Sequence, residues 1–170
     1  MKKAIFLLFA GLFISLAPSF GQEDKSKRPS PPAQAKATIG GKTITIDYSK
    51  PAVRDRIVWG EMVPYGKIWR TGANETTTFE VSDTVLIEGQ PLPKGRYGLY
   101  TVPGEKEWVI VFNKTIAWGE HSYSPADDVL RVTVPSKASA AFQERFIIEI
   151  FEKGVVSLLW ENLQVDFTVQ

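Results

Sequence analysis

The sequence predicts an all-β protein, an antiparallel β-sandwich or flattened barrel of about eight or nine strands. Two observations predict this class. Short segments of alternating apolar and polar residues recur along the chain, and Gly-, Pro-, Asp- or Ser-containing turns separate them. No segment after residue 33 shows the longer 3.6-residue periodicity of an amphipathic helix. Strands at this spacing are typical of a single antiparallel domain.

The first half of the domain is predicted from alternation and turn chemistry. Ile44, Ile46 and Tyr48 alternate with polar residues, which is the pattern of a half-buried strand. The β-branched and aromatic residues of 76–81 form a second strand, and Ser82-Asp83 turns the chain into a third. Residues 89–95 are expected to form a turn and 50–68 an irregular loop. The strands expected here are 43–48, 76–81, 84–88, 96–102 and 108–112.

The second half follows the same reasoning. Residues 115–128 are expected to form a second irregular loop. Leu130, Val132 and Val134 then alternate, and Pro135-Ser136 is expected to end that strand. Lys153-Gly154 is expected to form a hairpin turn. The strands expected here are 130–134, 145–151, 155–160 and 165–169.

The N-terminus has the pattern of a secretory signal. Lys2 and Lys3 precede an apolar run, 4–16, and small residues follow at Ser19 and Gly21. The sequence therefore predicts a signal peptide over 1–21, cleaved after Gly21, and an exported protein, periplasmic or extracellular. The alternative is a buried or anchoring N-terminal helix.

The expected organisation after cleavage is simple. Residues 22–33 are polar and proline-containing, which predicts a flexible leader, and 34–170 form one β domain. The apolar run of 4–16 is shorter than the roughly 20 residues that a membrane-spanning helix needs. No membrane span is therefore expected in the mature chain.

Charge and cysteine content exclude several function classes. The chain has a net charge of +1, and removing Lys2 and Lys3 leaves −1. Nucleic acid is not an expected partner, because the lysines and arginines form no cluster. The chain has no cysteine, which excludes disulfides, thiol chemistry and a lipoprotein anchor.

The densest group of functional side chains lies at 69–75. Trp69 offers an apolar ring with one donor, Arg70 a rigid fork of donors, Asn74 both donors and acceptors, and Glu75 acceptors. Such a set could stack a sugar ring and bind its hydroxyl groups. The alternative is a structural corner, in which Trp69 plugs the core, Arg70 pairs with a carboxylate and Asn74 caps a turn.

A second group lies in the loop after residue 113. It contains Trp118, the only histidine, His121, and then Tyr123, Asp127 and Asp128. His121 is the natural general acid or base near neutral pH. One histidine with no cysteine makes a zinc ligand set incomplete, so neither a metal nor a cofactor is expected. The alternative is a polar surface loop.

Two further interpretations concern Glu75. Paired with His121 or Asp128, it could act in a carboxylate-based hydrolase, and the separation of the two groups would decide the mechanism. Arg56 belongs to a local charge cluster at 54–56, which is either a solvated loop or an ion-pair partner for the carboxylate of the 69–75 stretch.

Several further strings of residues occur along the chain: Tyr48-Ser49-Lys50-Pro51, Arg56, Pro64-Tyr65-Gly66, Trp69-Arg70-Thr71-Gly72-Ala73-Asn74-Glu75-Thr76, Leu92-Pro93-Lys94-Gly95-Arg96-Tyr97-Gly98-Leu99-Tyr100, Trp108, Trp118-Gly119, Tyr123 and Asp128. Through these residues the chain resembles a known family, the domain of unknown function 2911 (DUF2911), over roughly residues 29–170. That family consists mainly of secreted proteins of Bacteroidetes-type bacteria, and it has no established activity, ligand or catalytic residue. The resemblance implies a secreted, single-domain, mostly β protein.

The leading hypothesis is a non-catalytic module that binds a small polar molecule or glycan. The pocket is expected at the end of the sandwich, between the 50–75 segment and the 113–128 loop. Trp69 would stack on the ligand, Arg70 and Asn74 would form hydrogen bonds, and Tyr123 would line the rim. The alternatives are the hydrolase and a structural or assembly partner of the cell envelope that uses an exposed sheet edge.

Overall fold

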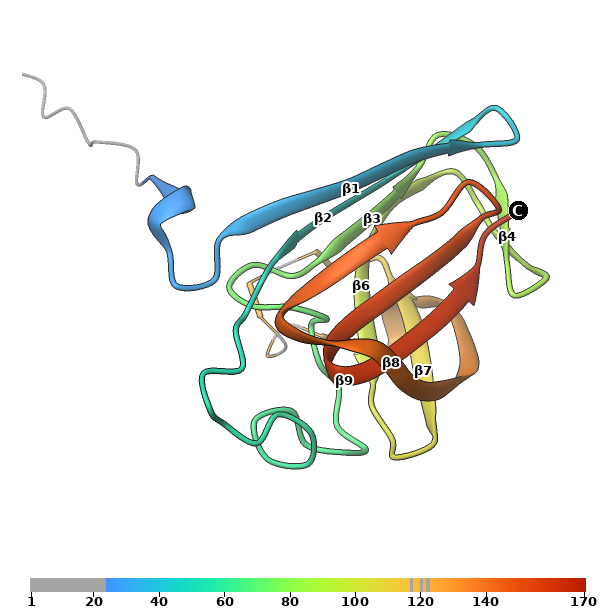
Figure 1. The fold of residues 1–170 in the computed structure, drawn as a ribbon. Helices are drawn as coiled ribbons and strands as arrows, with labels where there is room; N and C mark the ends of the chain where they lie inside the picture. The colour runs from blue at the N-terminus through green and yellow to red at the C-terminus, as the bar shows by residue number, and fades with distance from the viewer. Residues whose placement is uncertain (1–23, 117, 120, 122) are drawn as a thin grey trace, which may run out of the picture.

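The computed structural model describes residues 24–116, 118, 119, 121 and 123–170. The predicted signal peptide lies outside the described residues. The described part of the chain contains nine strands (Figure 1). They are β1 Pro32–Ile39, β2 Lys42–Ser49, β3 Thr78–Val81, β4 Val85–Ile87, β5 Gln90–Leu92, β6 Gly95–Val102, β7 Glu107–Asn113, β8 Asp128–Ile150 and β9 Val155–Thr168. Two single-turn 3-10 helices, η1 Lys25–Lys27 and η3 Pro125–Asp127, lie outside the sheets.

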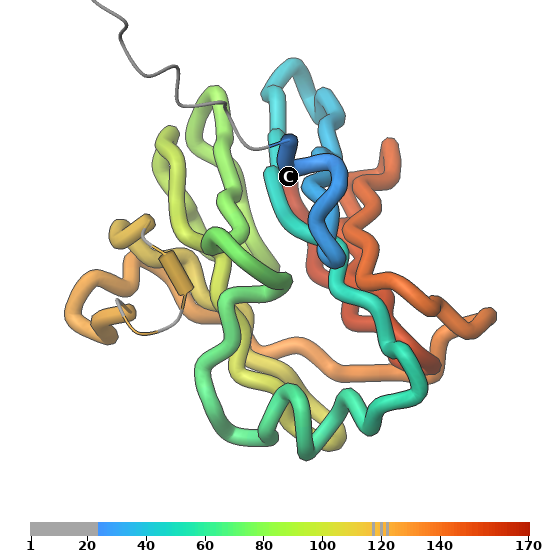
Figure 2. Tube along the Cα trace, turned by 90° about the vertical axis from the view of Figure 1, so that its left-hand side faces the viewer, coloured from blue at the N-terminus to red at the C-terminus, as the bar shows by residue number. Residues whose placement is uncertain are grey.

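Seven strands form one antiparallel sheet in the order β1-β2-β3-β6-β7-β8-β9, and β4 and β5 form a small second sheet. The large sheet curls so that β8 and β9 lie opposite the other strands (Figures 1 and 2). Segment 50–68 runs along the lower end of the molecule in Figure 2. The predicted all-β, sandwich-like fold is therefore confirmed.

The prediction that Pro135-Ser136 ends a strand is wrong, because β8 runs through it for 23 residues. The two residues mark a change of neighbour instead. Pro135 is the last partner of β7, opposite Glu107, and Ser136 is the first partner of β9, opposite Val165. A missing proline N–H is tolerated where the ladder is changing partner. The strand can therefore pass from one layer to the other without stopping.

Two strands are not among the predicted ones. β1 contains Ala33, Ala35 and Ala37, whose small side chains give little apolar contrast with their polar neighbours. It forms because the Gly40-Gly41 turn returns the chain along β2, with Ile39 opposite Lys42. β5 falls within 89–95, predicted to be a turn, and is only three residues long.

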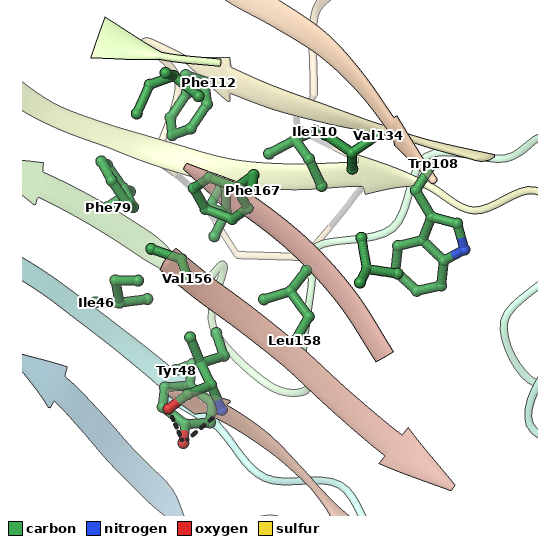
Figure 3. Close-up of a cluster of buried hydrophobic side chains, with 14 of the residues drawn as sticks. Ile46, Tyr48, Phe79, Trp108, Ile110, Phe112, Val134, Val156, Leu158 and Phe167 are labelled. Carbon is green, nitrogen blue, oxygen red and sulfur yellow. Dashed lines mark hydrogen bonds between the residues drawn. The ribbon is translucent and has the colours of Figure 1, made fainter. Parts of the chain in front are cut away.

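The core fills the space between the layers (Figure 3). Phe79, Phe112 and Phe167 come from three different strands and are fully buried. The rings of Phe79 and Phe112 lie edge to face, with centroids 4.9 Å apart. Tyr48 links the layers, since its hydroxyl accepts a hydrogen bond of 3.0 Å from the backbone N–H of Ile148.

No helix in the described ranges is long and apolar enough to cross a membrane.

Candidate functional site

Trp69 lies in the core, with 7% of its surface exposed. Its ring stacks on Trp160, with centroids 5.8 Å apart and planes 17° from parallel. Its indole N–H donates to the carbonyl of Gly72 at 3.1 Å, and its backbone pairs with Thr101. Because protein groups cover its faces and accept its proton, Trp69 is not placed to stack on a ligand.

The turn after Trp69 is held in a left-handed conformation. Thr71, Gly72 and Asn74 have φ angles of 55°, 155° and 58°. A Cβ atom on Gly72 would lie 3.1 Å from the carbonyl oxygen of Ser49, so glycine is needed here. The buried Thr77 hydroxyl donates to the Thr71 carbonyl at 2.7 Å. This geometry directs the end of the 69–75 stretch away from the core.

Arg70 is half-buried in this turn, and its carbonyl oxygen accepts a hydrogen bond from the backbone N–H of Thr77 at 3.3 Å. Arg70 does not line the groove described below.

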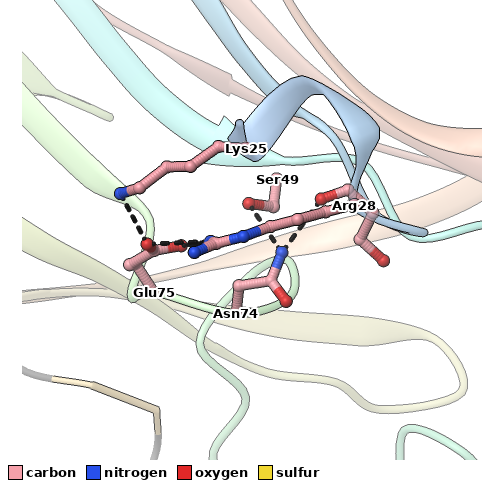
Figure 4. A network of polar contacts seen from close by, with 6 residues as sticks. Lys25, Arg28, Ser49, Asn74 and Glu75 are labelled. Carbon is pink, nitrogen blue, oxygen red and sulfur yellow. Dashed lines mark hydrogen bonds and ion pairs between the residues drawn. The ribbon is translucent and has the colours of Figure 1, made fainter. Parts of the chain in front are cut away.

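Asn74 binds the N-terminal segment to the domain (Figure 4). Its amide donates to the carbonyl of Ser30 at 2.9 Å and to the hydroxyl of Ser49 at 3.3 Å. Ser30 precedes β1 and Ser49 is the last residue of β2. The Asn74 donors therefore join three segments of the chain.

Glu75 accepts three hydrogen bonds from the N-terminal segment (Figure 4). Lys25 donates to one carboxylate oxygen at 2.8 Å, and Arg28 donates to both oxygens at 3.0 Å. Partial burial raises the pKa of the Glu75 carboxyl, but the hydrogen bonds outweigh it and lower the pKa to about 2. Glu75 is therefore an ionised acceptor at neutral pH.

Residues 24–31, part of the predicted leader, lie against the domain. The carbonyl of Pro29 accepts a hydrogen bond from the Arg145 side chain at 3.1 Å. The carbonyl of Pro31 accepts one from the backbone N–H of Lys50 at 2.9 Å. Together with Asn74 and Glu75, these contacts position the segment beside the start of β1.

A groove of about 730 Å³ lies over the outer face of the sheet at this point. Its floor is a row across neighbouring strands, in which Gln34 is opposite Asp47 and Asp47 is opposite Thr78. Gln34 donates to Asp47 at 2.7 Å, and Arg96 donates to Thr78 at 3.3 Å. The lining residues are Lys25, Pro32, Ala33, Gln34, Asp47, Tyr48, Ser49, Glu75, Thr76, Thr78, Arg96, Ile116 and Trp118.

Ile116 and Trp118, in the loop between β7 and β8, line one wall of the groove. Gly98 of β6 makes room for this loop, because a Cβ atom there would lie 2.6 Å from the carbonyl oxygen of Thr115. The buried Asn113 anchors the loop by donating to Ser124 and Asp128. Trp118 pairs with Glu75 in an isolated β-bridge, and 62% of its surface is exposed.

Tyr123 and Asp128 lie behind this wall and do not line the groove. The Tyr123 hydroxyl donates to Asp128 at 2.8 Å, and Arg131 donates to the Tyr123 hydroxyl at 2.9 Å. Arg131 also forms an ion pair of 2.8 Å with Asp128. Burial and the neighbouring Asp128 carboxylate raise the pKa of Tyr123. This network stabilises the base of the loop.

Two other predicted residues do not contribute to the groove. His121 is exposed, and Arg56 donates to the carbonyls of Val53 and Ala52 at 3.0 and 2.6 Å. The ion-pair partners of Glu75 are thus Lys25 and Arg28, and not Arg56. In the part of the chain that the structure describes, no three His, Cys, Asp or Glu side chains gather as metal ligands.

The sequence reasoning missed Lys25, Gln34, Asp47 and Arg96. The alternation of 43–48 contained one signal, because it directs Asp47 to the polar face of its strand. The other three become relevant only through strand pairing and the position of the N-terminal segment.

Comparison with known proteins gives one result. No curated protein and no solved structure matches the chain. The model of the family described as "Protein of unknown function (DUF2911)" matches residues 30–169. This range contains the 69–75 stretch and every groove residue except Lys25. The protein therefore belongs to the DUF2911 family.

Proposed function

We propose that the protein is a non-catalytic module that binds a small polar ligand or glycan in the groove over β1, β2 and β3. The observation that carries the proposal is the exposed ring of Trp118, which lies beside polar side chains that include both hydrogen-bond donors and hydrogen-bond acceptors. This keeps the function first inferred from the sequence and transfers the stacking role from Trp69 to Trp118.

Trp118 has the properties that ring stacking requires. The Trp118 side chain is 62% exposed, and contact of its apolar ring with water is unfavourable. Covering the ring with the apolar face of a ligand would therefore contribute favourably to binding. Ile116, which is 42% exposed, extends the apolar wall. A groove with an apolar wall and a few convergent polar groups is the usual form of a small-ligand site.

The polar groups of the groove match a hydroxylated ligand. Gln34 and Thr78 each offer both donors and acceptors. Asp47 and Glu75 offer acceptors, and Arg96 offers donors. A hydroxyl group, which is both donor and acceptor, can bind to any of them.

The hydrolase alternative receives less support. A glycosidase needs one carboxyl group that holds a proton near neutral pH, and the pKa of Glu75 is lowered to about 2. Asp128 is bound by Asn113, Tyr123 and Arg131 behind the loop. His121 does not line the groove. These contacts favour binding over proton transfer.

The test is a thermal-shift screen of the purified protein against neutral, anionic and amino-bearing oligosaccharides and small polar metabolites. At least one class should raise the melting temperature, and the shift should disappear in Trp118→Ala. Phe142→Ala is the matched control, because Phe142 is 53% exposed and lies outside the groove. If no compound stabilises the protein, or if Trp118→Ala leaves every shift unchanged, the proposal is wrong.

A further inference from the structure

We propose that the groove binds an electrically neutral oligosaccharide, which two cation–carboxylate pairs recognise by its hydroxyl groups. The inference rests on the proposed function and specifies its ligand class. It also assigns a ligand-binding role to Lys25, which lies before residue 30, where the family match begins.

The first pair is Lys25 and Glu75, 2.8 Å apart. Arg28 is 15% exposed and holds both Glu75 oxygens from the buried side, whereas the Lys25 side chain is 55% exposed. A carboxylate has about four acceptor sites, and these two residues donate three hydrogen bonds to it. The backbone N–H of Glu75 also bonds to the carboxylate, so this pair presents to a ligand mainly the donors of the exposed Lys25 ammonium.

The second pair is Arg96 and Asp47, 3.6 Å apart, with side chains 52% and 45% exposed. Gln34 donates to one oxygen of Asp47, and Thr78 accepts a hydrogen bond from Arg96. The separation of 3.6 Å is longer than a hydrogen bond, so a ligand hydroxyl can connect the two groups. The second pair thus presents a donor next to an acceptor.

This arrangement favours an uncharged ligand. The groove is lined by two cationic and two anionic side chains, and each lies beside one of opposite sign. A charged ligand that approaches either pair meets a like charge at close range. A hydroxyl group donates to the carboxylate and accepts from the cation without changing the charge balance.

The spacing of the pairs favours more than one sugar ring. Asn74, next to Glu75, contacts Ser49, and Asp47 lies two residues earlier on the same strand. At about 3.4 Å per residue, Ser49 and Asp47 lie about 7 Å apart along β2, so the two pairs lie at different points along the groove. A ligand that reaches both pairs must carry hydroxyl groups several ångströms apart, as linked sugar rings do. Trp118, bridged to Glu75, offers its ring at the first pair.

The experiment measures dissociation constants by calorimetry. The probes are neutral hexose oligosaccharides of one to six rings, oligogalacturonides of equal length and chitosan oligomers. We expect a neutral chain to bind most tightly, with affinity that rises between one ring and two. Lys25→Met and Asp47→Asn should each weaken binding about tenfold, the effect of losing one hydrogen bond to a charged group.

Controls separate this inference from the proposed function. Lys137→Met and Asp166→Asn alter an exposed ion pair outside the groove and should leave affinity within about twofold of the original, as expected for distant sites. If a charged oligosaccharide binds more tightly than every neutral one, or if Lys25→Met and Asp47→Asn bind normally, the inference is wrong and the groove function stands. If no probe or metabolite binds, both are wrong.

Discussion

Glu75 and Trp118 face each other in an isolated antiparallel bridge, which connects the turn before β3 to the loop between β7 and β8. The bridge places an ionised carboxylate beside the most exposed tryptophan side chain described. It connects the 69–75 stretch, which enters the core at Trp69, to the solvent-facing groove. Glu75 is thus part of the groove, whereas Trp69 is structural and Asn74, bonded to Ser30 and Ser49, does not line the groove.

The ion pairs of Glu75 should make stability depend on pH. Its pKa falls from 4.5 to about 2 on folding, so its contribution is present above pH 4.5 and is lost as the pH falls toward 2. The side chain is 39% exposed, so solvent screening limits the effect to about 1 kcal/mol or less. The melting temperatures of the protein and of Glu75→Gln should converge between pH 5 and pH 2. Glu80→Gln, which removes the same charge elsewhere, is the control. A difference in melting temperature between the protein and Glu75→Gln that stays constant from pH 5 to pH 2 would contradict the prediction.

The two tryptophans of the site should respond differently to truncation. Trp69→Ala removes a core ring that stacks on Trp160, and should lower the free energy of unfolding by about 3–5 kcal/mol. Trp118→Ala removes an exposed side chain and should change it by less than about 0.5 kcal/mol. Urea denaturation followed by circular dichroism measures both values. Similar losses for the two variants would contradict the assignment of Trp69 to the core and Trp118 to the surface.

Gly98 should control the position of the groove wall. A Cβ atom there would lie 2.6 Å from the Thr115 carbonyl and 2.8 Å from the Tyr100 ring, so Gly98→Ala must displace the loop. We expect a loss of about 1–3 kcal/mol of stability, as for other overpacked sites. We also expect a shift in Trp118 fluorescence, obtained as the difference between the spectrum of each protein and that of the same protein carrying Trp118→Phe.

Gly95→Ala is the control for that experiment. The nearest atom to its Cβ is the Tyr97 hydroxyl at 3.0 Å, which belongs to a side chain and can move. Gly95→Ala should therefore leave the Trp118 emission unchanged. An equal spectral shift in both variants would show that Gly98 has no special role in placing the loop.

The signal peptide proposed for residues 1–21 makes a separate prediction about processing. Protein recovered from the periplasm or medium should begin at Gln22, as N-terminal sequencing or intact mass will show. Gly21→Tyr should block cleavage and leave a precursor that retains residues 1–21, because the cleavage site requires a small residue there. A Gln22→Asn variant, which leaves Ser19 and Gly21 intact, should be cleaved normally. A protein that keeps residue 1 after export would contradict the prediction.

Most of the fold could be predicted because strand alternation is local. Ile44, Ile46 and Tyr48 identify β2 through their spacing alone. Pro135 shows where local reasoning fails. Proline breaks a ladder in an ordinary strand, but β8 exchanges one neighbour for another at that residue. The chain curvature that permits this exchange is a property of the whole sheet.

The candidate site, like the fold, could be predicted from the sequence only in part. The sequence by itself determined that Glu75 would belong to a dense group of polar side chains at 69–75 and that Trp118 would lie in a loop, because both follow from the local residue types. Only the tertiary structure decided that Trp69 is covered by Trp160 and that Lys25 reaches Glu75, because burial and long-range ion pairs depend on which segments meet. A groove built from six separate segments has no signature in any one of them, since its shape comes from the curl and pairing of the sheet.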